Sequence, residues 1–132
     1  MYFCLQKLKR WKLKKKICFD IDGVICKIRK DNNYKKSQPI KKNIRFINNL
    51  KDKGFKIILF TSRFMGRTNE NQRKAKSLGY KLTKDQLKRW GLSYDKLIMG
   101  KPSYDLIVDD KSLFFNKNWI DTLKIKINYN KY

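Results

Sequence analysis

Four short apolar runs along this chain each stop at polar residues. The runs occupy residues 17–19, 55–60, 96–99 and 105–108. Each run is short and apolar enough to form a buried strand of a parallel sheet. In open parallel α/β sheets the carboxyl ends of the strands share one edge, and ligands bind there. The pattern therefore predicts a parallel sheet whose functional site lies at this edge.

The segments between the runs carry helical patterns. Apolar residues recur at helical spacing over 40–50, directly after Pro39, and Gly54 ends the pattern. Residues 69–72 begin with Asn and end with Gln, which predicts the cap of a second helix that stops at Gly79. A helix is therefore expected on each side of the second strand.

A third helix and the tail complete the expected fold. Residues 82–87 have the pattern of a capping box with a hydrophobic staple, and the helix that they begin should end at Gly91. Residues 119–127 alternate at their end, which is typical of an edge strand. The order of strands and helices predicts an α/β fold, a three-layer Rossmann-like arrangement with a parallel central sheet.

The first apolar run is followed by two carboxylates, Asp20 and Asp22, and then by Gly23. In an extended strand, side chains two residues apart point to the same side, so both acids can converge on one small volume. Neighbouring carboxylates repel each other unless a cation neutralises them. The pair suits a divalent metal, with one Asp free to attack phosphorus and the other to carry a proton. The same Asp-x-Asp-Gly sequence is also common in calcium loops and turns.

The other three strand ends supply complementary groups. The second run is followed by Thr61, the third by Lys101 and the fourth by Asp109 and Asp110. Metal-assisted phosphoryl transfer needs acids for Mg²⁺, a hydroxyl for phosphate oxygens and an ammonium to offset charge. Strand ends are often polar for structural reasons alone. Four ends with complementary chemistry in one short chain favour the phosphoryl-transfer interpretation.

These motifs resemble those of a known family. Asp-x-Asp-Gly-Val, Thr-Ser-Arg, Gly-Lys-Pro and Asp-Asp look like the four motifs of the haloacid dehalogenase-like (HAD) phosphohydrolase superfamily, over about residues 16–115. The chain looks most similar to the small capless phosphatases associated with capsule and surface-polysaccharide biosynthesis. Large-cap relatives insert a domain after the first or third strand. Residues 23–39 and 99–105 leave room only for a small flap and a tight connection, which implies an open site.

The resemblance implies a role for each matching residue. Asp20 is the nucleophile that forms an aspartyl-phosphate, and Asp22 is the general acid and then the base that activates water. Thr61 binds the transferring phosphoryl group, and Lys101 neutralises charge on it and on Asp20. An acid at the Asp22 position fits phosphatases, because family dehalogenases lack one there and the transport ATPases carry Thr.

The resemblance also implies a Mg²⁺ cofactor and a set of substrate contacts. The implied metal ligands come from four acids: Asp20, Asp22 (also through its backbone carbonyl), Asp109 and Asp110. Asp110 is favoured as the direct Mg²⁺ ligand. Asp109 lies beside it in the sequence, either as a further ligand or as a group that contacts the ligands. The implied substrate-binding residues are Thr61, Ser62, Arg63, Arg67 and Lys101. Arg63 is expected to grip a substrate phosphate or carboxylate, because Arg can bind such anions bidentately.

Composition agrees with one small enzyme domain. The chain has 132 residues, 41% of them hydrophobic, and we expect a basic leader over 1–15 followed by a catalytic domain over 16–132. Three cysteines without a Cys-x-x-Cys pair predict neither a disulfide framework nor a zinc ribbon. The lack of His excludes Ser-His and Cys-His triads and leaves carboxylates as acid–base groups. No apolar run is long enough to span a membrane, so a cytoplasmic enzyme is expected.

The formal net charge of +23 is the strongest competing feature. Such a charge is typical of nucleic-acid-binding domains. The basic residues are mostly Lys scattered along every segment, however, a pattern that an AT-rich coding sequence also produces. The densest run, residues 7–16, carries an apolar stripe that suits RNA or an anionic membrane surface; alternatively it is a frayed leader.

The sequence therefore favours a Mg²⁺-dependent phosphomonoester hydrolase that works through an aspartyl-phosphate. Its expected substrate is a phosphorylated sugar or a related small intermediate of surface-polysaccharide synthesis. A neighbouring subunit of a homo-oligomer is one way to cover an open site. Two alternatives stay open: a polynucleotide end phosphatase, which uses the same acids and explains the charge, and a non-catalytic basic module that binds nucleic acid or membranes.

Overall fold

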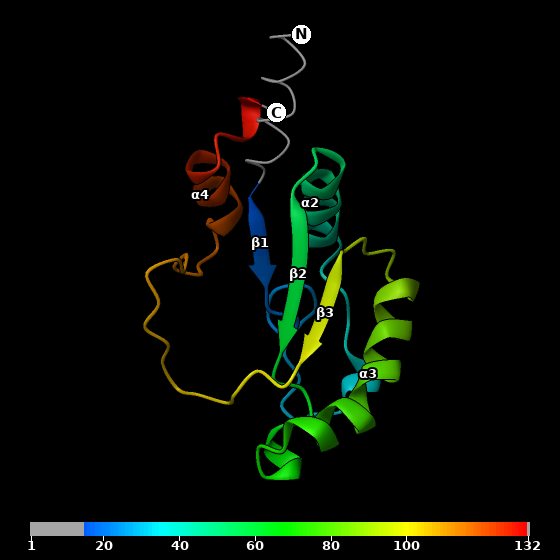
Figure 1. The fold of residues 1–132 in the computed structure, drawn as a ribbon. Coiled ribbons are helices and arrows are strands. Elements are labelled where there is room, and N and C mark those ends of the chain that lie inside the picture. Colours follow the sequence, from blue (N-terminus) through cyan, green and yellow to red (C-terminus); the bar gives the residue numbers. More distant parts are fainter. Residues whose placement is uncertain (1–14, 132) are drawn as a thin grey trace, which may run out of the picture.

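The computed structural model describes residues 15–131, which form a small α/β fold (Figure 1). The strands of this part of the chain are β1 Lys16–Phe19, β2 Lys56–Thr61 and β3 Lys96–Met99. Its α-helices are α2 Lys41–Asp52, α3 Gln72–Arg89 and α4 Trp119–Lys126, and its short 3-10 helices are η1 Tyr34–Lys36, η2 Gly66–Thr68 and η3 Tyr129–Lys131. The predictions for the basic leader fall almost wholly on residues 1–14, outside the described residues.

The strands form one parallel sheet in the order β1-β2-β3. Ile17 pairs with Ile57 in the first ladder and Leu59 with Leu97 in the second, so the carboxyl ends of the strands lie at the same edge. The first three predicted strands are confirmed, and so is the α/β, Rossmann-like fold with a parallel central sheet. This register brings together the polar residues that follow the strands.

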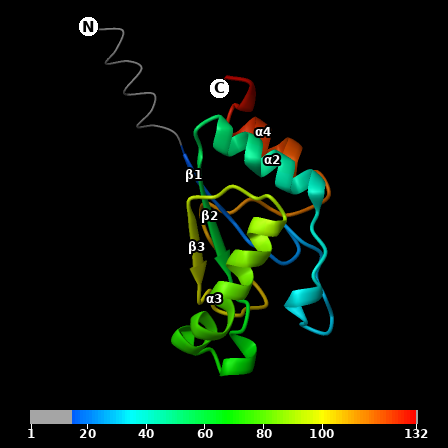
Figure 2. The same cartoon turned by 90° about the vertical axis from the view of Figure 1, so that its right-hand side faces the viewer.

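The helices pack their apolar stripes against the sheet. Figure 2 shows α2 and α4 on the same side of the sheet, while α3 runs beside β3. The first predicted helix is confirmed as α2, in which Ile47 and Leu50 are fully buried. Trp119 of α4 packs against both the sheet and α2. Its ring centre lies 6.0 Å from that of Phe19 in β1 and 5.8 Å from that of Phe46 in α2.

The second and third predicted helices are one continuous helix, α3. Its N-cap is Asn71, whose side chain accepts a hydrogen bond from the Lys74 backbone N–H at 3.0 Å. The predicted cap at residue 69, the predicted stop at Gly79 and the predicted capping box over residues 82–87 are therefore wrong. Gly79 serves packing instead, because a Cβ at this position would lie 2.3 Å from Cδ2 of Phe64. A sequence pattern does not distinguish such a close approach from a helix stop.

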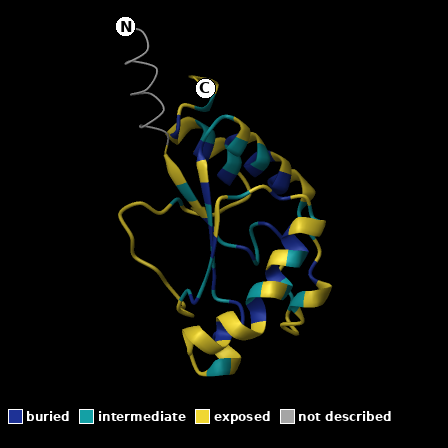
Figure 3. Ribbon diagram, turned by 45° about the vertical axis from the view of Figure 1, so that its right-hand side comes forward, coloured by how far each residue is buried: buried dark blue, intermediate teal, exposed yellow. Residues whose placement is uncertain are grey.

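The fourth predicted strand is wrong. Residues 105–108 form an exposed loop, in which Leu106 is 83% exposed and Val108 94% (Figure 3). An apolar run becomes a strand only where its backbone N–H and C=O groups find partners on a neighbouring strand. Here the chain that leaves β3 runs away from β1 and returns only at α4 (Figure 1). Among the described residues, the sheet therefore ends at β1.

The tail forms a helix, α4, where the sequence predicted an edge strand. Trp119, Leu123 and Ile127 recur every four residues, and each is at most 8% exposed. This helical stripe outweighs the short alternation at the end of the tail, because it buries three large apolar side chains. Across residues 15–131, α4 and the other helices are not long and apolar enough to cross a bilayer.

We expect Gly79→Ala to destabilise the protein. Alanine is the better helix former by about 1 kcal/mol, but overpacking of a filled site costs about 1–3 kcal/mol, and the added methyl group meets the Phe64 ring. Chemical denaturation followed by circular dichroism should show a net loss of about 1 kcal/mol in the free energy of unfolding. Gly66→Ala is the control, because nothing lies within 4 Å of a Cβ placed there. A Gly79→Ala protein more stable than wild type would contradict the packing of Phe64 against this helix.

Candidate active site

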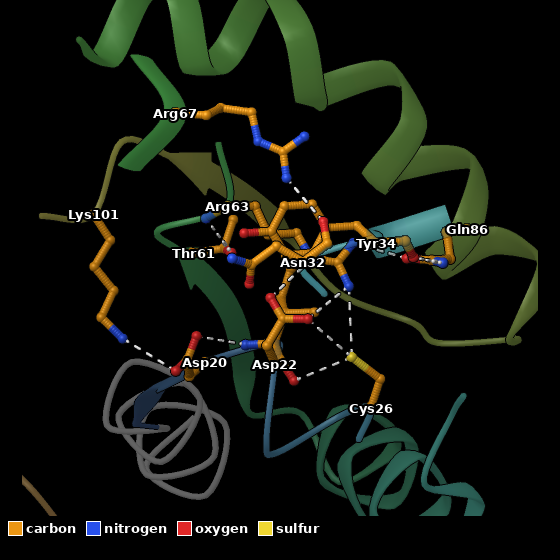
Figure 4. Close-up of polar contacts among 11 residues, drawn as sticks. Asp20, Asp22, Cys26, Asn32, Tyr34, Thr61, Arg63, Arg67, Gln86 and Lys101 are labelled. Carbon is orange, nitrogen blue, oxygen red and sulfur yellow. Dashed lines mark hydrogen bonds and ion pairs between the residues drawn. The ribbon is translucent and has the colours of Figure 1, made fainter. Parts of the chain in front are cut away.

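The site lies at the carboxyl edge of the sheet, where Asp20 follows β1, Thr61 ends β2 and Lys101 follows β3 (Figure 4). Lys101 Nζ is 3.3 Å from Asp20 Oδ2, and Asp20 Oδ1 accepts a hydrogen bond from the Ile21 N–H at 2.8 Å. The Lys101 backbone N–H donates to the Thr61 carbonyl oxygen at 3.1 Å. Ser62, the residue after Thr61, is half-buried. Three predicted site residues are thus brought together, each from a different strand end.

Asp20 is a partly buried acid with its own cation. Burial is the largest effect and raises the pKa of the Asp20 carboxyl, while the Lys101 charge and the Ile21 N–H lower it and the Asp22 charge raises it. Burial lowers the pKa of Lys101, but the Asp20 carboxylate and Tyr104 outweigh it, so this pKa is raised. Lys101 therefore remains an ammonium that can neutralise both Asp20 and an incoming anion.

Asp22 faces a different cation, Arg63. The guanidinium donates from Nε to Asp22 Oδ2 at 2.9 Å and from Nη2 to Asp22 Oδ1 at 3.0 Å. Arg63 is only 1% exposed, and arginine is almost never fully buried unless it is paired. The sequence predicted a substrate contact for Arg63, but its guanidinium lies against Asp22 instead. The Asp-x-Asp motif is therefore served by two separate cations.

Two further residues support this ion pair, and the sequence pattern did not single out either. The Cys26 thiol is buried and donates to Asp22 Oδ1 at 3.3 Å. Burial, followed by the Asp22 charge, raises the pKa of the Cys26 thiol to about 12, so it keeps its proton. Gln86 Oε1 accepts from Arg63 Nη1, and Gln86 Nε2 donates to the Tyr34 carbonyl, each at 2.7 Å. Gln86 could have been noticed in the sequence because it is a polar residue within the buried stripe of α3.

A flap, residues 27–37, lies beside the site and is as short as the sequence predicted. Arg67, another predicted substrate contact, binds this flap: its Nη2 donates to the Asn32 carbonyl oxygen at 2.8 Å. The Arg67 guanidinium also lies 5.2 Å from the ring centre of Tyr34 and 4.6 Å from that of Phe64. Cation–π contacts of this kind hold a guanidinium in place, so Arg67 anchors the flap in the arrangement observed.

The structure does not bring the four predicted metal-binding acids together. Asp109 and Asp110 are exposed on the loop that follows β3. In the described part of the chain, no three Asp, Glu, Cys or His side chains are grouped so that they could hold a metal ion. Asp20 and Asp22 offer the oxygen atoms that Mg²⁺ prefers, but Mg²⁺ demands near-octahedral coordination and both Asp22 oxygens already face an arginine. In this arrangement the residues do not fit a complete Mg²⁺ site.

Removing the Lys101 charge should raise the pKa of Asp20 further. Lys101 is the largest of the effects that lower this pKa, and the burial that raises it remains. In Lys101→Met, NMR titration of the Asp20 carboxyl carbon should therefore be displaced to higher pH than in wild type. Lys96→Met is the matched control, because Lys96 is exposed on β3. An unchanged Asp20 titration in Lys101→Met would show that the two groups are not paired in solution.

Comparisons with known proteins agree with this fold. Residues 17–105 match haloacid dehalogenase-like hydrolases, a range that ends before Asp109. The crystal structure of a target protein from Vibrio cholerae is similar, with a TM-score of 0.70 and 24% identity over 86% of this chain and 98% of that chain. A chain in the structure of the Pnkp1/Rnl/Hen1 complex is similar, with a TM-score of 0.51 and 18% identity over 92% of this chain and 36% of that chain. No curated protein matches the sequence. Because the matched range covers most of its residues, the chain belongs to the haloacid dehalogenase-like hydrolase family.

Proposed function

We propose that this chain is a phosphomonoester hydrolase that works through an aspartyl-phosphate at Asp20. The observation that carries the proposal is the Asp20–Lys101 pair, 3.3 Å apart, at the edge of the sheet where Thr61 and Asp22 also lie. Membership of the haloacid dehalogenase-like hydrolase family supports phosphatase-type hydrolysis in general. A carboxylate beside an ammonium suits attack on phosphorus, because the cation offsets the charge that gathers there.

The reaction would use the two carboxylates in turn. In the first step an Asp20 oxygen attacks phosphorus, the bond to the leaving oxygen breaks, and Asp22 gives that oxygen a proton. In the second step water attacks the aspartyl-phosphate, Asp22 takes a proton from the water, and phosphate leaves as Asp20 is restored. Lys101 offsets the charge of the phosphoryl oxygens. The Thr61 hydroxyl, which is buried and accepts from the Arg63 backbone N–H at 3.1 Å, is the further hydrogen-bond donor proposed for these oxygens.

The cofactor in this proposal is Mg²⁺, which the likeness of the four motifs to those of haloacid dehalogenase-like phosphohydrolases implies. A bound Mg²⁺ would supply charge stabilisation at the phosphoryl group. Asp20 and the Asp22 backbone carbonyl are the oxygen groups already at the site. A complete set of ligands requires Asp110, with or without Asp109, to approach from the exposed loop after β3.

The substrate that we favour is a phosphorylated sugar or a related intermediate of surface-polysaccharide synthesis. This choice is supported by the likeness of the four motifs to small capless phosphatases. The short flap is consistent with it, because a site without a large cap admits a large or nucleotide-linked substrate. Recognition of the organic part of such a substrate falls to groups around the open edge of the sheet.

Asp20→Asn should abolish phosphate release from a panel of phosphomonoesters, because a neutral amide does not attack phosphorus. The expected loss is about 10⁴-fold or more, the scale seen when a catalytic triad residue is removed. Each reaction is run with Mg²⁺ and with EDTA, and circular dichroism shows whether the variant is folded. Asp31→Asn is the matched control, because Asp31 is an exposed flap acid paired with Arg29. If the folded wild-type protein releases no phosphate in the presence of Mg²⁺, the proposed phosphatase activity is refuted. If Asp20→Asn stays active, Asp20 is not the nucleophile.

A phosphorylated polynucleotide end is the second candidate substrate. The net charge of +23 favours a polyanion, and the chemistry at Asp20 would be the same. The flap beside the site carries four exposed lysines: Lys27, Lys30, Lys35 and Lys36. These four lysines place positive charge next to the site, where it could attract the phosphates of a polynucleotide.

Competition separates the two candidate substrates. We expect single-stranded DNA or RNA with a terminal phosphate to inhibit hydrolysis of the preferred sugar phosphate only weakly at about 0.15 M salt, where screening limits non-specific binding. The same oligonucleotide without its terminal phosphate is the control for binding by charge alone. Strong inhibition that needs the terminal phosphate, with phosphate released from the oligonucleotide, would instead assign the polynucleotide substrate. Binding without any hydrolysis would favour the non-catalytic module.

A further inference from the structure

We propose that Arg63 is a positioning residue that fixes Asp22 for the water step, the hydrolysis of the aspartyl-phosphate. This inference rests on the proposed function. Arg63 meets both oxygens of Asp22 with two donors, Nε at 2.9 Å and Nη2 at 3.0 Å. A planar guanidinium fork of this kind sets the orientation of a carboxylate as well as its position, which the point charge of a lysine does not do.

Arg63 is itself held on several sides. Its Nη1 donates to Gln86 Oε1 at 2.7 Å, its Nη2 also reaches Cys26 Sγ at 3.5 Å, and its guanidinium carbon lies 4.8 Å from the Tyr34 ring centre. The Arg63 side chain has 0% exposure, whereas that of Asp22 keeps 25%. The arginine is therefore the fixed support, and Asp22 is the member of the pair that a substrate or a water molecule can reach (Figure 4).

The donors around Asp22 point to the second step of the reaction. Two N–H groups of Arg63 and the Cys26 thiol all donate to this carboxylate. Because both Asp22 oxygens accept hydrogen bonds, the group is oriented as an acceptor, and it is as an acceptor that it meets the attacking water in the second step. The water oxygen bonds to phosphorus, the phosphorus–oxygen bond to Asp20 breaks with its electron pair returning to Asp20, and the proton passes from water to Asp22.

The test uses p-nitrophenyl phosphate, whose leaving group needs no added proton, so that the water step is isolated. In Arg63→Met we expect kcat to fall by about 10²-fold, the cost of misplacing a catalytic group by about 1 Å. KM should fall with kcat and leave kcat/KM nearly unchanged, because kcat/KM depends only on the steps up to formation of the aspartyl-phosphate. Phosphorylated protein should accumulate during turnover, as seen by intact-mass spectrometry after acid quenching. Asp20→Asn in the same background should abolish that added mass. A merely structural role of Arg63 predicts a slower enzyme without this accumulation.

Two further variants sharpen the comparison. Arg67→Met is the matched control, because Arg67 lies 5.2 Å from the same Tyr34 ring but donates to the Asn32 carbonyl of the flap. We expect no accumulated phosphoprotein in this variant. Arg63→Lys keeps the charge without the fork and should accumulate phosphoprotein to a smaller extent, which preserves the test if the Met variant does not fold.

A kinetic cycle tests whether Arg63 acts through Asp22. Asp22→Asn should also accumulate phosphoprotein, and adding Arg63→Lys to it should slow turnover by no more than about twofold, because residues that act as a unit are not additive. Additive losses would overturn the proposed coupling.

The outcomes that overturn the inference differ from those that overturn the proposed function. A folded Arg63 variant that turns over slowly but carries no phosphate would show a structural role only. A raised KM with kcat unchanged would make Arg63 a substrate contact. Wild-type protein that neither hydrolyses phosphomonoesters nor becomes phosphorylated would refute the proposed function, and the positioning role with it.

Discussion

Two carboxylates, two residues apart at the end of one strand, can be held together here because each faces its own cation. Lys101 approaches Asp20 from beyond β3, and Arg63 approaches Asp22 from beyond β2. Partial burial and mutual repulsion would otherwise disfavour two charged acids at this point. The parallel register of the sheet is what delivers both cations to the same edge. The rest of the site is arranged around this pairing.

The two ion pairs are unlike, and the difference has chemical consequences. Asp20 is paired with a lysine, whose long stem and single charged head can also meet an incoming phosphoryl group. Asp22 is paired with a buried arginine that is itself fixed by Gln86. Because Gln86 also donates to the Tyr34 carbonyl, the flap backbone and the partner of Asp22 share one support. Asp20 is therefore paired with a flexible cation that can also bind substrate, while Asp22 is held in one orientation by a fixed cation.

The part of this site that the sequence predicts is the part set by strand ends. Asp20, Thr61 and Lys101 follow apolar runs, and the parallel sheet brings them together as expected. The pairing of Asp22 with Arg63 could not be predicted from the sequence. The sequence shows an arginine in Thr-Ser-Arg, but it does not show the direction in which that side chain points. That direction depends on Gln86, far along the chain in α3.

Two of the errors in the predicted fold have a common physical cause, which is that a local pattern does not show which residues pack against it. Gly79 resembles a helix stop, yet it makes room for the Phe64 ring inside α3. Residues 105–108 are apolar enough for a strand, but they lie in a loop away from β1, which leaves Asp109 and Asp110 exposed. Periodicity therefore predicted α2 correctly, and it failed at these two places, where a tertiary partner decides. In the tail, a short alternation was given more weight than the helical stripe of α4.

The central claim is that Asp20 becomes covalently phosphorylated. The most direct measurement is to incubate wild-type protein with p-nitrophenyl phosphate, quench the reaction, reduce acyl-phosphates with borohydride and map the modified residue by mass spectrometry of peptides. The account predicts reduction at Asp20, in the peptide that follows β1. Turnover with phosphate attached to another residue, or with no acyl-phosphate formed, would contradict it.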